Sequence, residues 1–191
     1  MRRAWIIRSL CLSVVLVALV VAPSTASAVP VTPVPTTVVV DPFELSLVRQ
    51  INTFRARRHL PLVRIDYKLQ RASEWMSLDM QRTDSLDHID GLRRQLVRRL
   101  AAFHYPVRLA AVGENVARGR IAPNQTLADW LRSPIHIAIL KDRRWHAVGV
   151  GRNCVIRVDT TQDCWWTANF GARWTQAMPP RTPPVVSDPT S

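Results

Sequence analysis

The sequence predicts an α+β domain, because helical spacing comes first along the chain and strand spacing comes last. Between residues 42 and 140, apolar side chains recur every three or four positions. After Trp145 the apolar residues are mostly β-branched or aromatic, in two runs that flank a polar turn at residues 159–163. We expect two or three antiparallel strands there. Helices followed by strands favour an α+β fold rather than a doubly wound parallel sheet.

Two helices are expected at the start of the domain. Asp41 and Pro42 supply an N-cap and a first-turn proline. The first helix should end near His59, before Pro61. Asp66 is the expected N-cap of the second helix. The apolar stripes are Leu47, Val48, Ile51 and Phe54 in the first helix, and Leu69, Ala72, Met76 and Met80 in the second.

Three shorter helices are expected before the strands. The first should begin at Asp90 and end before Pro106. The second should cover residues 123–131, with Asn124 or Thr126 near its start. The third should cover residues 134–140, with Ser133 as its cap. In the first of these we expect an apolar face of Leu92, Leu96, Leu100 and Phe103, and a solvent face of Arg93, Arg94, Arg98 and Arg99.

The two ends of the chain differ in composition from the domain between them. Three arginines precede an apolar run at residues 10–22, and Ala26-Ser27-Ala28 resembles a cleavage site, so residues 1–28 are predicted to be a signal peptide. The alternative is a retained membrane anchor, for which the run is short. We expect a proline-rich linker at 29–42, a domain at 43–176 and a disordered proline-rich tail at 177–191. The mature chain would then have no transmembrane segment and would be secreted or associated with the cell envelope.

The chain is strongly basic, with a formal net charge of +12. Loss of Arg2, Arg3 and Arg8 with the signal peptide would leave +9. A basic exported protein attracts anionic lipid headgroups and cell-wall polymers. The arginines are spread over several helices, so a generally solvated basic surface is an equal alternative, and a protein partner is a further one. No nucleic-acid-binding motif is present, so we expect no specific nucleic-acid partner.

Two of the three cysteines lie within the domain, at Cys154 and Cys164. An exported chain meets an oxidising compartment, where an even pair usually forms a disulfide. The spacing predicts a bridge across a hairpin rather than two free thiols. A zinc pair is disfavoured because no second pair of cysteine or histidine residues is nearby.

Three residues are candidates for chemistry: Glu114, His136 and His88. Glu114 lies in an apolar stretch after Gly113, and a buried carboxylate is costly unless it is paired. His136 is near the start of a short helix, whose dipole favours a neutral imidazole. His88 is surrounded by carboxylates. Each also has a structural alternative, as a loop-holding glutamate, a core histidine or a surface histidine.

An ordered set of short motifs resembles the CAP superfamily of cysteine-rich secretory, antigen 5 and pathogenesis-related proteins, in its short bacterial form. The resemblance covers about residues 45–171. Its pieces are Ile51-Asn52-Thr53-Phe54-Arg55 with Leu60-Pro61-Leu62, Asp79-Met80, His88, Gly113-Glu114-Asn115-Val116-Ala117, residues 130–136, Ile139-Leu140, Val148-Gly149-Val150-Gly151 and residues 166–171.

The resemblance implies a three-layer α-β-α sandwich with a small antiparallel sheet and a shallow cleft. His88, Glu114 and His136 match the two histidines and the first acidic residue of that cleft, and the two histidines would hold a divalent cation, commonly zinc, in a weak or open site. The second acidic residue is missing, because Leu131-Arg132-Ser133 offers none and Asp129 precedes Trp130. Whether Asp87 or Asp90 replaces it is open.

Two functions follow from these observations. The favoured one is a secreted protein that acts by binding a lipid or sterol, a wall polymer or another protein. The alternative is a metal-dependent hydrolase, in which zinc between His88 and His136 would activate water and Glu114 would take its proton. No serine or cysteine occupies a recognisable nucleophile motif. We therefore expect binding rather than catalysis.

Overall fold

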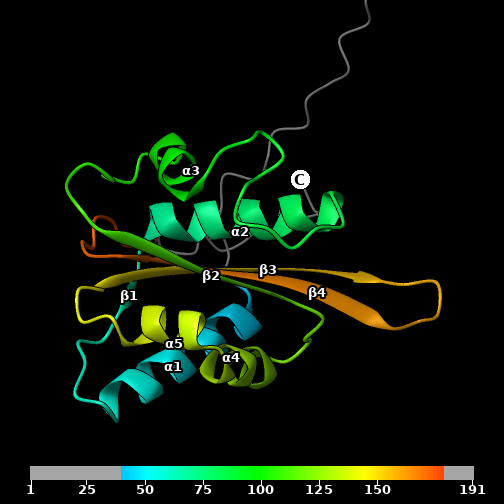
Figure 1. Ribbon diagram of the computed structural model, residues 1–191, viewed down its shortest axis with the longest axis horizontal. Coiled ribbons are helices and arrows are strands. Elements are labelled where there is room, and N and C mark those ends of the chain that lie inside the picture. The colour runs from blue at the N-terminus through cyan, green and yellow to red at the C-terminus, as the bar shows by residue number, and fades with distance from the viewer. Residues whose placement is uncertain (1–39, 179–191) are drawn as a thin grey trace, which may run out of the picture. The chain divides into compact units, whose positions relative to one another are not determined.

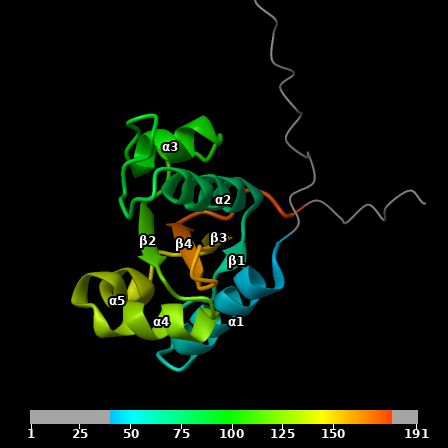
Figure 2. The ribbon, with the colours of Figure 1, turned by 90° about the vertical axis from the view of Figure 1, so that its right-hand side faces the viewer.

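The computed structural model describes residues 40–178. The predicted signal peptide, most of the predicted linker and nearly all of the predicted tail lie outside these residues. Two helical layers cover the two faces of one sheet, with α2 and α3 on one side and α1, α4 and α5 on the other (Figures 1 and 2). The elements in order are α1 (Pro42–Ala56), β1 (Arg64–Ile65), α2 (Tyr67–Arg82), α3 (Leu96–Ala102), β2 (Val112–Arg118), α4 (Pro123–Arg132), α5 (Pro134–Lys141), β3 (Ala147–Ile156) and β4 (Gln162–Gly171).

The sheet has four strands in the order β1-β3-β4-β2. Strand β4 pairs antiparallel with both β3 and β2, whereas the two residues of β1 pair parallel with β3. The α+β class and the three-layer sandwich are confirmed. The sheet differs from the expected one in the parallel pairing of β1 and in including β2, which lies before Trp145.

The first two helices begin where the sequence indicates. The Asp41 side chain accepts the backbone N–H of Phe43, and Glu44 accepts the backbone N–H of Asp41, which completes a capping box at α1. Asp66 accepts backbone N–H groups at the start of α2. Both helices bury their predicted apolar stripes.

The third helix begins later than expected, at Leu96 rather than at Asp90. The cause is a tight turn in which Asp90 accepts backbone N–H groups and pairs with Arg94, while Arg93 has a φ of 60°. Leu92 therefore lies outside the helix and is 62% exposed, contrary to its expected place in the core. Arg99, expected to face solvent, is fully buried.

The predicted helix cap at Ser133 is also corrected. Ser133 precedes α5, but its side chain makes no capping hydrogen bond. Helix α4 begins after Ala122 without a side-chain cap, and Asn124 and Thr126 lie near its start as expected. Both helices start with a proline, which leaves one fewer backbone N–H to satisfy.

Two glycines of β3 let α2 lie directly against the sheet. A Cβ at Gly149 would be 2.1 Å from the backbone carbon of Leu69, and one at Gly151 would be 2.3 Å from the backbone of Ser73. At this close approach Ser73 donates a hydrogen bond to the Gly149 carbonyl at 2.9 Å. The glycines thereby fix the position of α2, which leads into the loop that carries His88.

The predicted disulfide is confirmed. Cys154 of β3 and Cys164 of β4 are directly opposite in the sheet and are bonded to each other. The bridge closes the hairpin whose turn was predicted at residues 159–163. In residues 40–178, no helix is long and apolar enough to cross a membrane.

Candidate functional site

Glu114 lies in β2 with its side chain toward the layer of α2 and α3. Side chains alternate along a strand, and Val112 and Val116 on either side of it pack against residues of α2. Gly113 faces the opposite layer, where a Cβ would meet Trp145 at 2.9 Å. The Glu114 side chain is only 2% exposed. The sequence reasoning did not predict β2 as a strand.

Both carboxylate oxygens of Glu114 are engaged. His88 Nδ1 donates to Glu114 Oε1 at 2.9 Å, and Arg99 Nη2 donates to Glu114 Oε2. Arg99 also donates from Nη1 to the backbone oxygen of His88 at 3.1 Å, and its side chain is fully buried. Hydrogen bonds between ionised groups are the strong ones in proteins. Arg99 therefore holds both the carboxylate and the loop that carries the histidine.

The two histidines differ in their surroundings. The hydrogen bond to Glu114 raises the pKa of His88, against the smaller opposing effect of partial burial. Burial lowers the pKa of His136, and the charge of His88 lowers it further. The backbone oxygen of His136 accepts a hydrogen bond from Asn115 Nδ2 at 3.2 Å, which links α5 to β2. The structure thus joins His88 to Glu114 directly, whereas His136 is linked to β2 through its backbone oxygen. We call Arg99, Glu114, His88 and His136 the Glu114 site.

The donor set does not fit a catalytic zinc centre. Such centres use three protein ligands, and within residues 40–178 no group of three or more His, Cys, Asp or Glu side chains could hold a metal ion. His88 and His136 would supply two imidazoles, and Glu114 already accepts from Arg99 and His88. A weak zinc site on the two histidines stays a prediction.

None of the other carboxylates considered from the sequence joins Glu114. Asp129 pairs with Arg120 and Arg132. Asp90 is buried and pairs with Arg94. Asp87 accepts the backbone N–H groups of His88 and the next residue. The position beside Glu114 is occupied by a cation, Arg99, which the sequence reasoning had assigned to the surface.

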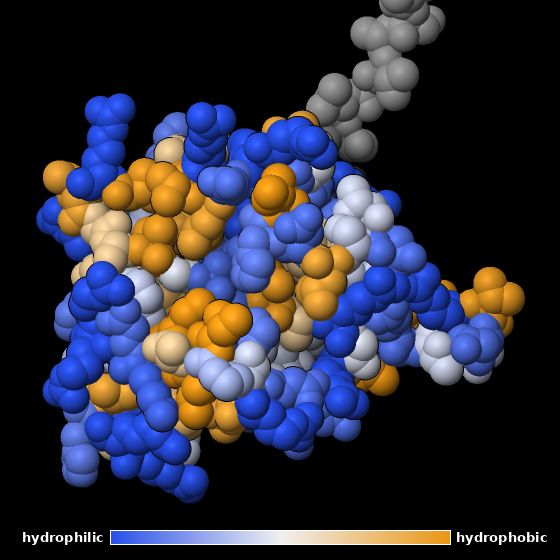
Figure 3. All heavy atoms as spheres, in the orientation of Figure 1, coloured by the Kyte–Doolittle hydropathy of each residue, from blue (hydrophilic) through white to orange (hydrophobic). Residues whose placement is uncertain are grey.

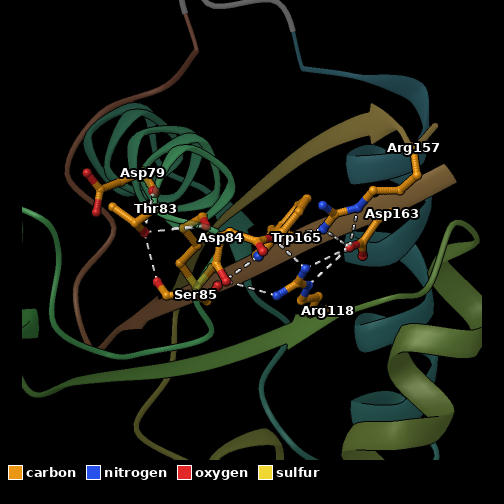
Figure 4. A network of polar contacts seen from close by, with 9 residues as sticks. Asp79, Thr83, Asp84, Ser85, Arg118, Arg157, Asp163 and Trp165 are labelled. Atoms are coloured by element: carbon orange, nitrogen blue, oxygen red, sulfur yellow. Dashed lines mark hydrogen bonds and ion pairs between the residues drawn. The ribbon is translucent and has the colours of Figure 1, made fainter.

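A second polar network anchors the loop that carries His88 (Figure 4). Arg118 donates to the backbone oxygen of Asp84 at 3.0 Å and to its Oδ1 at 2.6 Å, and Arg157 donates to the same Oδ1 at 2.8 Å. Trp165 Nε1 donates to the backbone oxygen of Ser85 at 2.7 Å. Strands β2 and β4 and the disulfide-closed hairpin thus hold the segment four residues before His88.

The same loop borders a hollow of about 570 Å³. Its lining includes Asp87 and Ile89, on either side of His88, together with Arg93 and Arg98. Glu114 and His136 are not part of that lining. The Glu114 site and the hollow are therefore separate, although both include residues of the loop that carries His88.

The chain was compared with known families and structures. The family model described as CAP, the cysteine-rich secretory protein family, matches residues 48–170. An outer surface protein from Borrelia burgdorferi is similar in structure, with a TM-score of 0.54 and 20% identity over 66% of this chain and 90% of that chain. An extracellular protein containing an SCP domain from Bacillus anthracis has a TM-score of 0.55 and 24% identity over 70% of this chain and 44% of that chain. At these identities the likeness shows the fold alone. Among curated protein sequences, none matches this chain.

Proposed function

The chain belongs to the CAP family, and from this premise we propose that it is an exported protein that acts by binding at the cell envelope. Three observations support export and an outer location: the leader pattern of residues 1–28, the disulfide within the domain, and the similarity to proteins described as extracellular or outer surface. The high net positive charge favours an anionic ligand, such as a wall polymer or a lipid headgroup.

The observation that carries binding over catalysis is the ion pair between Arg99 and Glu114. A general base must have a lone pair directed at the proton that it removes. In this chain one oxygen of Glu114 accepts from a buried guanidinium and the other accepts from His88. The hydrolase alternative, with Glu114 as base beside a metal held by His88 and His136, would need that pair to open. The arrangement instead supports a fixed site whose imidazoles contact a ligand.

Two assays on the same preparation test this proposal. We expect the protein to sediment with isolated cell-wall polymer, and to show no hydrolysis of casein or of bis(p-nitrophenyl) phosphate, with or without added Zn²⁺. The matched variants are Glu114→Gln and His136→Gln, which remove the base and the free imidazole separately. Zinc-dependent hydrolysis by the wild type that is lost in a normally folded Glu114→Gln variant would contradict the proposal and support the hydrolase.

A further inference from the structure

One segment of the domain is basic without any acidic residue. Residues 91–113 contain five arginines and no Asp or Glu. Two of these arginines are neutralised within the fold, Arg94 by Asp90 and Arg99 by Glu114. The other three, Arg93, Arg98 and Arg108, are exposed and make no ion pair with a carboxylate in the part of the chain that the structure describes. Three cationic groups are thus available to an external partner.

Large apolar side chains accompany these arginines. Leu92 is 62% exposed, Val97 is 52% exposed and Leu109 is 70% exposed. Each is next in sequence to one of the exposed arginines. Figure 3 shows apolar residues gathered over α3 and the segment that follows it, with hydrophilic side chains projecting around them. We call these six residues the α3 surface.

The orientation of α3 explains why these arginines and apolar side chains are exposed. Leu100 and Arg99 face the interior and are fully buried, whereas Val97, Arg98 and Ala101 are exposed. The helix packs its inner side against α2 and β2, and no other helix or strand within residues 40–178 covers its outer side (Figures 1 and 2). An exposed apolar patch with a rim of polar residues marks a protein or membrane interaction site, whereas single scattered apolar residues do not.

We propose that the α3 surface docks the protein on an anionic lipid bilayer. Charge complementarity selects a negatively charged partner, and cations near an anionic membrane gain energy individually. The apolar residues distinguish a bilayer from a soluble anionic polymer. A bilayer interface buries apolar side chains while it contacts the cations, whereas a hydrated polymer has little apolar area to cover them. This inference is independent of what the Glu114 site binds.

The hollow beside α3 fits the same partner. Arg93 and Arg98 both line this space of about 570 Å³. Gln95 adds a further polar residue. Of the two carboxylates in the lining, Asp90 is paired with Arg94. Arg93 and Arg98 supply the cations for the phosphate of a lipid headgroup.

The test is sedimentation with vesicles of phosphatidylcholine alone or of phosphatidylcholine and phosphatidylglycerol in equal parts. The mature chain, residues 29–191, is used throughout, because residues 1–28 are predicted to be removed on export and their apolar run would itself bind vesicles. Arg93→Gln/Arg98→Gln should lower partitioning onto the anionic vesicles about 25-fold, at about fivefold per arginine. The matched control is Arg49→Gln/Arg143→Gln, which removes the same charge from two exposed arginines, one in α1 and one just after α5, that make no ion pair among the described residues.

A third variant tests the apolar part of the surface. Leu92→Asn/Val97→Asn keeps every charge and should lower binding to the anionic vesicles, most clearly at high salt, where the electrostatic attraction is screened. Circular dichroism checks that each variant is folded. Equal losses in the two arginine double variants would overturn the proposal, since net charge alone would then explain binding. Unchanged binding of Leu92→Asn/Val97→Asn would also overturn it and would assign the surface to a polymeric anion. Cell-wall sedimentation with no vesicle binding would refute the bilayer while leaving the proposed function intact.

Discussion

Replacing Arg99 by methionine should destabilise the domain strongly, because Glu114 would be left buried without its cation. The Arg99 side chain is 0% exposed and that of Glu114 is 2% exposed. Removing one partner of a buried ion pair costs about 3–5 kcal/mol. His88 would still donate to Glu114, so we expect the lower end, about 3 kcal/mol. For a domain of this size that loss corresponds to a fall in Tm of about 10 °C.

Urea denaturation followed by tryptophan fluorescence measures the loss, and Arg98→Met is the matched control. Arg98 is the neighbouring residue of the same helix, is exposed and makes no ion pair among the described residues, so its substitution should change the free energy of unfolding by no more than about 0.5 kcal/mol. The double variant Arg99→Met/Glu114→Leu should recover most of the loss, since an apolar pair can replace a buried ion pair.

Two results would refute this reasoning. One is an Arg99→Met variant as stable as Arg98→Met, which would mean that the buried pair contributes little. The other is a double variant whose loss equals the sum of the two single losses, which would mean that the two side chains are not coupled.

Calorimetric titration with Zn²⁺ adds an independent measurement, because Arg99→Met frees a Glu114 oxygen and should bind the ion more tightly than the wild type does.

Three further predictions concern the stability of the fold. Burial raises the pKa of Glu44 from 4.5 to about 8, so between these pH values the folded state keeps a proton that the unfolded state loses. The free energy of unfolding should therefore fall as the pH rises through this range, by at most about 1.4 kcal/mol per pH unit. Urea denaturation of Glu44→Gln should show no such fall. Gly149→Ala places a Cβ against the α2 backbone and should lower the free energy of unfolding by about 3 kcal/mol, measured by thermal denaturation. Gly119 has a φ of +92° but lies in open space, so Gly119→Ala should cost only about 1 kcal/mol. Cys154→Ser/Cys164→Ser removes a bridge over a separation of 10 residues and should cost about 2.5 kcal/mol, and a reductant should lower the Tm of the wild type but not that of the double variant.

The predictable parts of the fold are those where one face is apolar and the ends carry distinct residues. Helices α1 and α2 have both features, with Asp41 and Asp66 as caps. Strand β2 has neither, because Gly113 to Ala117 are all buried between the two helical layers. A strand covered on both faces shows no alternation of polar and apolar residues. The stretch around Glu114 was therefore recognised as a motif but not as a strand.

The resemblance to the family located Glu114 and His88, but the residue that controls Glu114 came from the structure. Arg99 was assigned to solvent because it follows Arg98 in a run of arginines. Its spacing contained the information, since position 99 is three residues after Leu96 and four before Phe103 and therefore shares their helical face. An arginine on an apolar face requires a buried partner. No local pattern says that the partner is a carboxylate 15 residues away.

Helix α3 connects the two proposals through its geometry. Successive residues of a helix are rotated by about 100°, so Arg98 and Arg99 cannot face the same environment. Arg99 is buried against Glu114 and, together with His88, engages both oxygens of that carboxylate. Arg98 lines the outer hollow together with Arg93. Because one short helix carries both, a bilayer that binds its outer side lies next to the loop that holds His88. The Glu114 site would then meet ligands at the level of the lipid headgroups, where an amphipathic ligand is concentrated.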